Sequence, residues 1–281
     1  MAFGTVLVAL GALGHNSWVV ADRTRLDGPG TVRLAFVTGH DAFPVGENAT
    51  QPERIASWTV VRGETSTPVT GYAIEGRDLV AHAELTAPGL HIAAAALYPR
   101  FIEFDGDTFT RYLETERAKD ALEQRRRDGS ESRPGLEYYT KFGKAFVQVG
   151  PIDPSDTSHA EPVGHRLEIV PVTNPVGWTV GQTVRVRVLL EGRVAAHHPI
   201  ASGHESSPAH RYEQELMTDG EGVAEFVIDK PGHWFIRTHT IGACDGLPAV
   251  ALPPATGDGS FEPSHADWES YWASMTVGVA E

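Results

Sequence analysis

The sequence predicts a mainly β protein, made of two β-sandwich domains of Ig-like or related type with one short helix between strands. Three observations support this prediction. Short runs of alternating apolar and polar residues recur along the 281-residue chain. Its 29 glycines and 19 prolines are spread along it, as expected for many turns between short strands. Hydrophobic residues make up 41% and charged residues 21%, which is typical of a globular protein with a buried core.

In the first half of the chain, the alternation is clearest at residues 31–37. Val32, Leu34 and Phe36 fall on one face of this run, and Arg33 falls on the other. Further runs of this kind occupy residues 56–61, 79–85 and 91–97. Turns that contain glycine and proline separate the runs, and this spacing favours a sandwich over alternating strands and helices.

One helix is predicted over residues 107–127. Asp107 can cap it, and Phe109, Tyr112 and Leu113 begin an apolar stripe. The segment then becomes a run of mixed charge that includes Arg125–Arg127. The three arginines could form a binding patch, but a solvated helix face is the favoured interpretation.

The best domain boundary is the Gly- and Pro-containing segment 150–156. It separates a predicted N-terminal sandwich domain, residues 15–150, from a C-terminal one, residues 160–281. The second half again alternates, most clearly at residues 183–190. Further strand-like runs occupy residues 223–229, 233–241 and 271–279.

Residues 1–14 predict a signal peptide. The apolar run at residues 3–13 is shorter than the ~20 residues that a membrane-spanning helix needs. Ala12 and Gly14 are small residues placed for cleavage before His15. No basic residue precedes the run, so a first buried strand is the alternative. With cleavage, the mature protein is expected to be periplasmic or secreted and not to span a membrane.

Charge and cysteine content exclude several classes of partner and site. The net charge of −14 argues against nucleic acid and anionic membranes, both of which need a basic surface. Cys244 is the single cysteine, so neither an internal disulfide nor a thiolate metal cluster is expected.

The sequence predicts that the protein is not an enzyme. It has no Gly-x-Ser-x-Gly motif, no phosphate-binding loop and no dinucleotide-binding glycine pattern. His204-Glu205 resembles the start of a zinc-protease motif. However, Pro208 stands where the second histidine belongs, and a proline there prevents the required helix.

The thirteen histidines are the remaining candidates for chemistry. Cleavage after Gly14 would make His15 the N-terminal residue, whose amine and ring nitrogen can chelate one metal ion. The alternative is a buried or capping histidine at the start of the first strand. A loop-rich stretch holds a second possible surface site, made of His197, His198, His204 and His210. Imidazole ligands suit copper, nickel, cobalt and zinc.

Motifs along almost the whole chain match a known bacterial family. His15-Asn16-Ser17-Trp18 follows the predicted signal peptide, with Asn16 where members carry an aspartate. Further matches are the turn at 87–91, the helix start with Phe109, Tyr112 and Leu113, the segment 138–150 with Lys144, and the segments 162–171 and 174–175. The stretch 267–276, rich in tryptophan and acidic residues, is the most specific. The chain resembles a bacterial periplasmic family of unknown function that is associated with cobalt or nickel uptake.

This resemblance implies a second domain similar to carboxypeptidase-regulatory or transthyretin-like modules. It also implies a metal site at the recurring histidines, which are His15, His91 and His239 here. The ligand would be a divalent transition metal ion (nickel, cobalt or copper), and an envelope metal transporter would be the partner. The alternation in residues 233–239 places His239 opposite Trp234 and Ile236, so it should face outwards or towards the other domain. The alternative function is a structural or interaction module of the cell envelope with no metal role.

Overall fold

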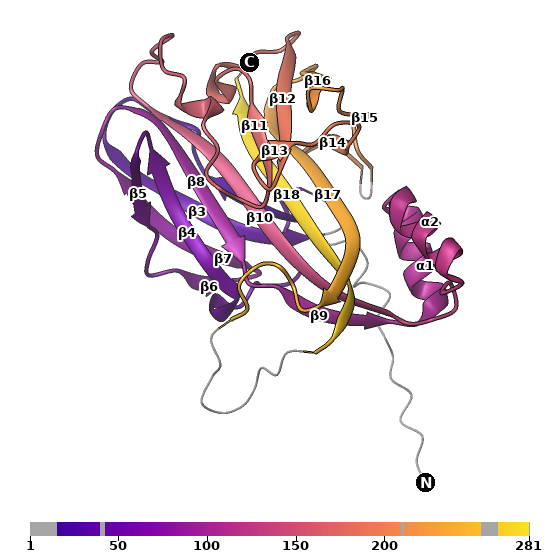
Figure 1. The fold of residues 1–281 in the computed structure, drawn as a ribbon. Helices are drawn as coiled ribbons and strands as arrows, with labels where there is room; N and C mark the ends of the chain where they lie inside the picture. Colours follow the sequence, from indigo (N-terminus) through magenta and orange to yellow (C-terminus); the bar gives the residue numbers. More distant parts are fainter. Residues whose placement is uncertain (1–15, 40–42, 209–210, 254–263, 281) are drawn as a thin grey trace.

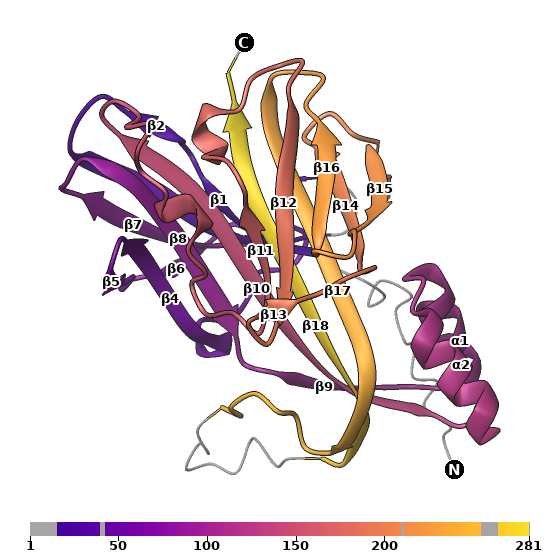
Figure 2. The same ribbon diagram turned by 45° about the horizontal axis from the view of Figure 1, so that its top comes forward.

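The computed structural model of the protein describes residues 16–39, 43–208, 211–253 and 264–280. These residues form three β-sheets and two short helices (Figures 1 and 2), which confirms the mainly β class. The predicted signal peptide and His15 lie outside the described residues.

Sheet A is an antiparallel sheet from the first part of the chain. Its strand order is β1-β3-β7-β6. The strands are β1 (Asn16–Ala21), β3 (Gly30–Gly39), β7 (Asp78–Leu85) and β6 (Ala73–Glu75). The alternating run predicted at residues 31–37 lies within β3, where Val32, Leu34 and Phe36 are buried.

Sheet B is the large sheet at the centre of the molecule. Its main path has the order β15-β14-β17-β18-β10-β8-β4-β5, and β2 and β9 pair with β10. The bounds are β15 (Gln214–Met217), β14 (Pro199–His204), β17 (Gly232–Gly246), β18 (Ala266–Val279), β10 (Gly135–Val149), β8 (Gly89–Leu97), β4 (Ile55–Arg62), β5 (Thr65–Pro68), β2 (Arg25–Leu26) and β9 (Arg100–Phe104). β10 and β18 run parallel, and this pair joins strands from the two halves of the chain.

Sheet C comes from the second half of the chain. It contains β11 (Leu167–Pro171), β12 (Thr183–Leu190), β13 (Arg193–Val194) and β16 (Val223–Val227). β12 coincides with the run predicted at residues 183–190, and its alternating burial places Val184, Val186 and Val188 in the core.

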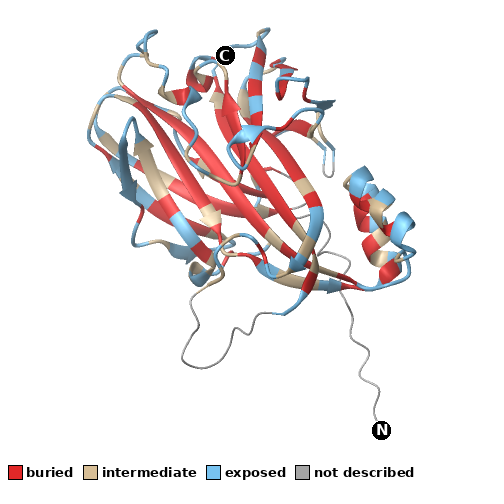
Figure 3. Cartoon of the chain, in the orientation of Figure 1, coloured by how far each residue is buried: buried red, intermediate tan, exposed pale blue. Residues whose placement is uncertain are grey.

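Sheets A and C cover opposite faces of sheet B. On β10, Ala145 belongs to the hydrophobic cluster that includes Phe36 of sheet A, whereas Phe146 belongs to the cluster that includes Val186 of sheet C. Successive side chains of a strand point to opposite faces, so sheet B is buried on both sides. Figure 3 shows this as nearly continuous burial along the central strands.

The two halves therefore share one sheet. β10 ends at Val149, close to the boundary predicted at residue 150, and the segment after it leads to sheet C. Each half contributes a covering sheet, but strands of both halves build sheet B. The division into two separate domains remains a prediction.

A pair of helices stands where a single helix was predicted. α1 spans Gly106–Thr115 and α2 spans Lys119–Asp128. The break comes at Arg117, whose φ of 56° is left-handed and incompatible with a continuous α-helix. Asp105, rather than Asp107, caps α1 by accepting a hydrogen bond from the backbone N–H of Thr108 at 2.8 Å.

The prediction of a solvated arginine face on the helix is wrong for Arg125. Arg126 and Arg127 are exposed, but Arg125 is buried. Its guanidinium donates to the backbone carbonyls of Glu131 and Arg133 at 2.6 and 2.9 Å, which holds the segment after α2 against the helix pair. Among the described residues, no helix is long and apolar enough to cross a membrane.

Candidate functional site

The histidines predicted as metal ligands occupy separate places. His91 lies on β8 and is buried. Its Nε2 is 2.9 Å from the backbone carbonyl of Ala87, which closes the turn before the strand. Burial lowers the pKa of His91 and so favours the neutral ring. These contacts give His91 a structural role at the start of β8.

His239 lies on β17 and faces the helix pair, which belongs to the N-terminal half of the chain. Its Nε2 is 2.8 Å from the backbone carbonyl of Glu116. Its Nδ1 is 2.9 Å from the guanidinium of Arg237. Burial lowers the pKa of His239 to about 4, so the ring is neutral at pH 7. The Nε2–H then donates to the carbonyl and Nδ1 accepts from the guanidinium, which leaves no ring lone pair for a metal ion.

The fold does not bring His91 and His239 together. On β8, His91 pairs with Val147 of β10. On β17, His239 pairs with Trp272 of β18, and Trp272 in turn pairs with Lys141 of β10. Six residues separate Lys141 from Val147, and a strand rises about 3.3 Å per residue, so the histidines are roughly 20 Å apart along the strands. One metal ion cannot contact both, since Zn–N bonds are about 2 Å long.

A buried ion pair fixes the helix pair to sheet B. The guanidinium of Arg237 is 2.8 Å from Oε2 of Glu116, and these side chains are only 6% and 10% exposed. Arg237 also donates to the hydroxyl of Tyr212. Burial alone would raise the pKa of Glu116, but Arg237 and His239 hold it below its usual value. The carboxylate is therefore ionised at neutral pH.

This ion pair also explains the break between the helices. The side chain of Glu116 binds Arg237, and its backbone carbonyl accepts from His239. Arg117 then adopts its left-handed conformation and redirects the chain into α2. Glycine and proline are absent from residues 114–127, so no sequence signal announces this turn. Arg237, a charged residue within the strand-like run 233–241, was the available hint of a buried partner.

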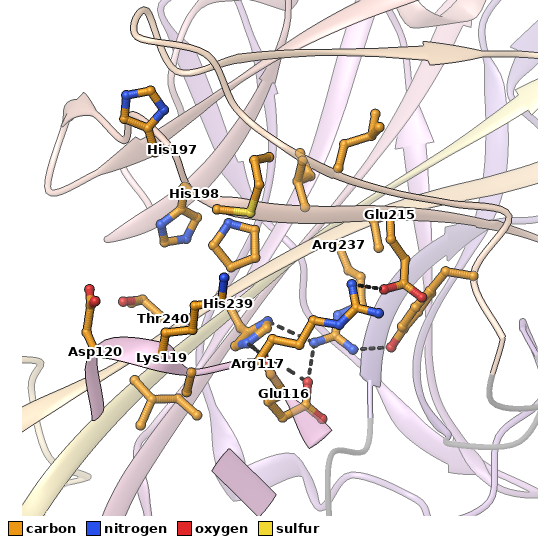
Figure 4. Close-up of a pocket in the computed structure, with 18 of the residues that line it drawn as sticks. Glu116, Arg117, Lys119, Asp120, His197, His198, Glu215, Arg237, His239 and Thr240 are labelled. Atoms are coloured by element: carbon orange, nitrogen blue, oxygen red, sulfur yellow. Dashed lines mark hydrogen bonds and ion pairs between the residues drawn. The ribbon is translucent and has the colours of Figure 1, made fainter. Parts of the chain in front are cut away.

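A cleft of about 700 Å³ lies between the helix pair and the edge of sheet B. Its lining comes from the connection between α1 and α2, from β14 and β15, and from β17 (Figure 4). The ion pair of Glu116 and Arg237 and the ring of His239 line it, together with His198 and Met217. Arg117 and Glu215 form a further ion pair between the helix connection and β15. The volume suits a small ligand.

His198 differs from the other described histidines of its stretch. Burial lowers the pKa of its ring, although an interaction with the backbone of His239 opposes this shift. Its Nε2 is buried and has no hydrogen-bond partner among the described residues. By contrast, both ring nitrogens of His204 are engaged, with Ser206 and with the carbonyl of Pro231.

The rest of the predicted stretch is dispersed. His197 is exposed and has a left-handed φ of 54°, while His210 lies outside the described residues. Within the part of the chain that the structure describes, no three His, Cys, Asp or Glu side chains gather in a way that could hold a metal ion.

The sequence from residue 12 to residue 242 matches the family model of DUF4198, a domain of unknown function. The chain belongs to the DUF4198 family. No curated protein matches this DUF4198 sequence.

Two solved structures are similar to the DUF4198 chain at low identity. One is native alpha-2-macroglobulin from Escherichia coli spanning domains MG0-NIE-MG1, with 9% identity, a TM-score of 0.19, and coverage of 80% of this chain and 94% of that one. The other is the three N-terminal domains of the bacteriophage RB49 Highly Immunogenic Outer Capsid protein, with 8% identity, a TM-score of 0.19, and coverage of 95% and 59%. Neither likeness carries an argument about function.

Proposed function

We propose that this DUF4198 protein is an exported, periplasmic protein that binds a divalent transition metal ion in the cleft beside the helix pair, with His198 as the anchoring ligand. Nickel, cobalt and copper are the candidate ions, and handling or delivery to an envelope transporter is the proposed role. The observation that carries the proposal is the buried Nε2 of His198, which lacks a hydrogen-bond partner among the described residues.

The surroundings of His198 suit a metal ligand. A ligating histidine usually hydrogen-bonds through its other ring nitrogen to a carbonyl or carboxylate, which fixes the tautomer. The backbone of His239, which interacts with the His198 ring, is the proposed partner for this contact. Because burial lowers the pKa of His198, the ring is neutral near pH 7, and a neutral ring is the form that binds metal.

Further donors are available at the same cleft. The imidazole of His197 and the thioether of Met217 both line it. Asn16, the first described residue, donates from Nδ2 to the hydroxyl of Tyr212 at 3.4 Å, and Tyr212 also lines the cleft. His15, the proposed mature N-terminus, lies outside the described residues, and we propose its amine and ring as further ligands. Nitrogen and thioether donors favour copper over nickel and cobalt.

Equilibrium dialysis of the processed protein against Cu(II), Ni(II) and Co(II) tests the proposal. Binding should follow the order copper, nickel, cobalt, and His198→Gln should weaken it at least tenfold. His82→Gln is the matched control, because His82 is an exposed histidine on β7. Equal affinity of the wild type and His198→Gln would refute the assignment of His198.

The alternative is a structural or interaction module of the envelope without a metal role. The structural engagement of His91 and His239 favours it, since both rings are used in hydrogen bonds that stabilise the fold. The same dialysis separates the two functions. If the wild type binds no more metal than a buffer control, the alternative stands.

A further inference from the structure

A second cavity, of about 570 Å³, lies on the other side of the His239–Trp272 pair from the cleft. The two rings stack with centroids 4.8 Å apart. His239 lines the cleft and Trp272 lines the second cavity, so the stacked rings form part of the wall between them. The chain segments around this cavity include the loop 47–51, the 3-10 turn that ends at Arg54, β9, the first part of β10 and α1.

The charged lining of this cavity contains three cationic and two acidic side chains. Arg54, Arg100 and Lys141 line it. The Nη2 of Arg54 donates to the backbone carbonyl of Tyr98 at 2.9 Å, whereas its buried Nε has no hydrogen-bond partner among the described residues. Lys141 is only 8% exposed. The acidic residues of the lining are Glu47 and Glu137.

Glu137 supplies the most specific feature. Its side chain is 1% exposed. One carboxyl oxygen, Oε1, accepts from the hydroxyl of Tyr112 at 3.1 Å and from the hydroxyl of Ser270. The other, Oε2, is buried and has no partner among the described residues. A protonated carboxyl can donate from this atom to an anionic oxygen.

Five aromatic residues form part of the remaining walls, beside neutral polar residues and the aliphatic residues Ala49, Leu97 and Ile102. Phe101, Phe104, Tyr112, Tyr139 and Trp272 all line the cavity. Aromatic rings prefer other flat, apolar rings at offset-stacked or edge-to-face geometry. A ligand that fits this lining combines a negatively charged group, which Arg54, Arg100 and Lys141 attract, with a flat apolar body.

We propose that this second cavity binds a small aromatic carboxylate. The carboxylate lies towards the cations and the Oε2 atom of Glu137, and the ring lies against the aromatic walls. A cavity of this volume falls in the usual range of small-molecule sites. This site is separate from the metal cleft and does not depend on the metal proposal.

Binding should weaken as the pH rises through neutrality. Burial raises the pKa of Glu137 to about 7, although Ser270 and Tyr112 oppose the shift. Burial, Arg54 and Arg237 lower the pKa of Lys141 to about 7, with Glu116 opposing. Above this pH, Glu137 becomes an anion and Lys141 becomes neutral. Both changes make the cavity less attractive to a carboxylate.

Isothermal titration calorimetry of the full chain tests the proposal, with benzoate as the probe. Inorganic phosphate tests for a simple anion site, and benzyl alcohol tests for a simple aromatic site. Benzoate should bind more tightly than either compound, and more tightly at pH 6 than at pH 8. If benzoate does not bind, or binds no better than phosphate or benzyl alcohol, the proposal fails.

Variants locate the site. Arg54→Gln should weaken benzoate binding about tenfold or more, because a charge-assisted hydrogen bond is lost. Arg100→Gln should weaken it less, and since Arg100 is exposed this variant should remain folded. Arg193→Gln, an exposed arginine on sheet C, is the matched control and should bind as the wild type does. If Arg54→Gln is folded and both variants bind benzoate as tightly as the wild type does, benzoate binds elsewhere and the assignment is overturned. Metal dialysis on the same variants should be unchanged, so the two proposals fail independently.

Discussion

Two buried lysines three residues apart on β10 have opposite surroundings. Lys144 faces sheet C, and its Nζ is 2.7 Å from Oε1 of Glu168, with both side chains almost fully buried. Lys141 projects from the other face of β10 and lines the second cavity near Glu137. The strand carries a charged group into the interior on each face. The two places differ in how completely the carboxylate oxygens of Glu168 and Glu137 are paired.

The Lys144 site is closed. Glu168 also accepts from the backbone N–H groups of Val163, Gly164 and His165 at 2.7, 3.0 and 3.1 Å. Burial would raise the pKa of Glu168, but Lys144 and these donors hold it below its usual value. The ionised pair fastens the segment before β11 to sheet B. With its acceptors filled, this pair stabilises the fold.

The Glu137 site is open. Oε2 of Glu137 and Nε of Arg54 are buried without hydrogen-bond partners among the described residues, and both residues line a cavity. An unpaired buried polar atom costs about 1–3 kcal/mol, so a fold that keeps two of them beside a cavity suggests a ligand that pairs with them. Buried charge alone therefore says little about function. Unpaired polar atoms on residues that line a cavity are the informative feature.

The largest expected effect comes from breaking the closed pair. Lys144→Met should lower the free energy of unfolding by about 3–5 kcal/mol, because it leaves the Glu168 carboxylate buried without its counter-charge. Chemical denaturation measures this loss. Benzoate binding at the second cavity should be unchanged in whatever fraction remains folded.

Two controls sharpen this test. Lys119→Met, at an exposed lysine of α2, should change stability by less than about 0.5 kcal/mol. The double variant Lys144→Met, Glu168→Leu should recover part of the loss, because an apolar pair can replace a buried ion pair. If Lys144→Met is as stable as the wild type, the pair contributes nothing and the contrast between the two sites fails.

An intermediate effect is expected at the open site, as a change in how stability depends on pH. The pKa of Glu137 is about 7 in the folded protein and 4.5 in the unfolded reference. Its contribution to stability is thus complete below about pH 4.5 and is lost as the pH rises to about 7. The loss amounts to roughly 3 kcal/mol at most, at 1.36 kcal/mol per pKa unit.

Glu137→Gln should remove this dependence. The neutral amide keeps the shape of the side chain and does not ionise, so the variant should gain stability relative to the wild type as the pH increases from 4.5 to 7. Urea denaturation at several pH values measures the difference. If the difference in unfolding free energy between the variant and the wild type is the same at every pH, Glu137 does not titrate in this range. The pH dependence of benzoate binding should also become shallower.

The sequence predicts the strands far better than the site. β12 coincides with the predicted run 183–190, since alternation directly reports a strand with one buried face. The parallel pairing of β10 with β18 joins residues more than 130 positions apart, and local patterns contain no information about it. The helix break at Arg117 depends on the contact of Glu116 with Arg237, which is equally remote.

Local sequence patterns also fail to identify the candidate ligands. His239 and His91 were chosen because they match motif positions, but ring hydrogen bonds formed only in the folded chain occupy them. His198 was one member of a dispersed stretch, and only its position beside β17 distinguishes it. Glu137 carries no sequence signal, because an acidic residue in a strand is usually solvated.

The smallest expected effect comes from removing one donor to Glu137. Tyr112→Phe deletes the hydroxyl that donates to Oε1 at 3.1 Å, while Ser270 remains as a second donor to the same atom. The variant should lose about 1 kcal/mol of stability, the usual value of one hydrogen bond.

Because the Tyr112 hydroxyl lowers the pKa of Glu137, its removal should also raise that pKa further, so the decline of stability with pH should extend above pH 7. Tyr72→Phe, at a ring that stacks on Trp58, is the matched control and should not shift this window. Should Tyr112→Phe leave the pH profile in place, the hydroxyl does not stabilise the ionised Glu137, and the open site would be less strongly coupled to α1 than the structure suggests.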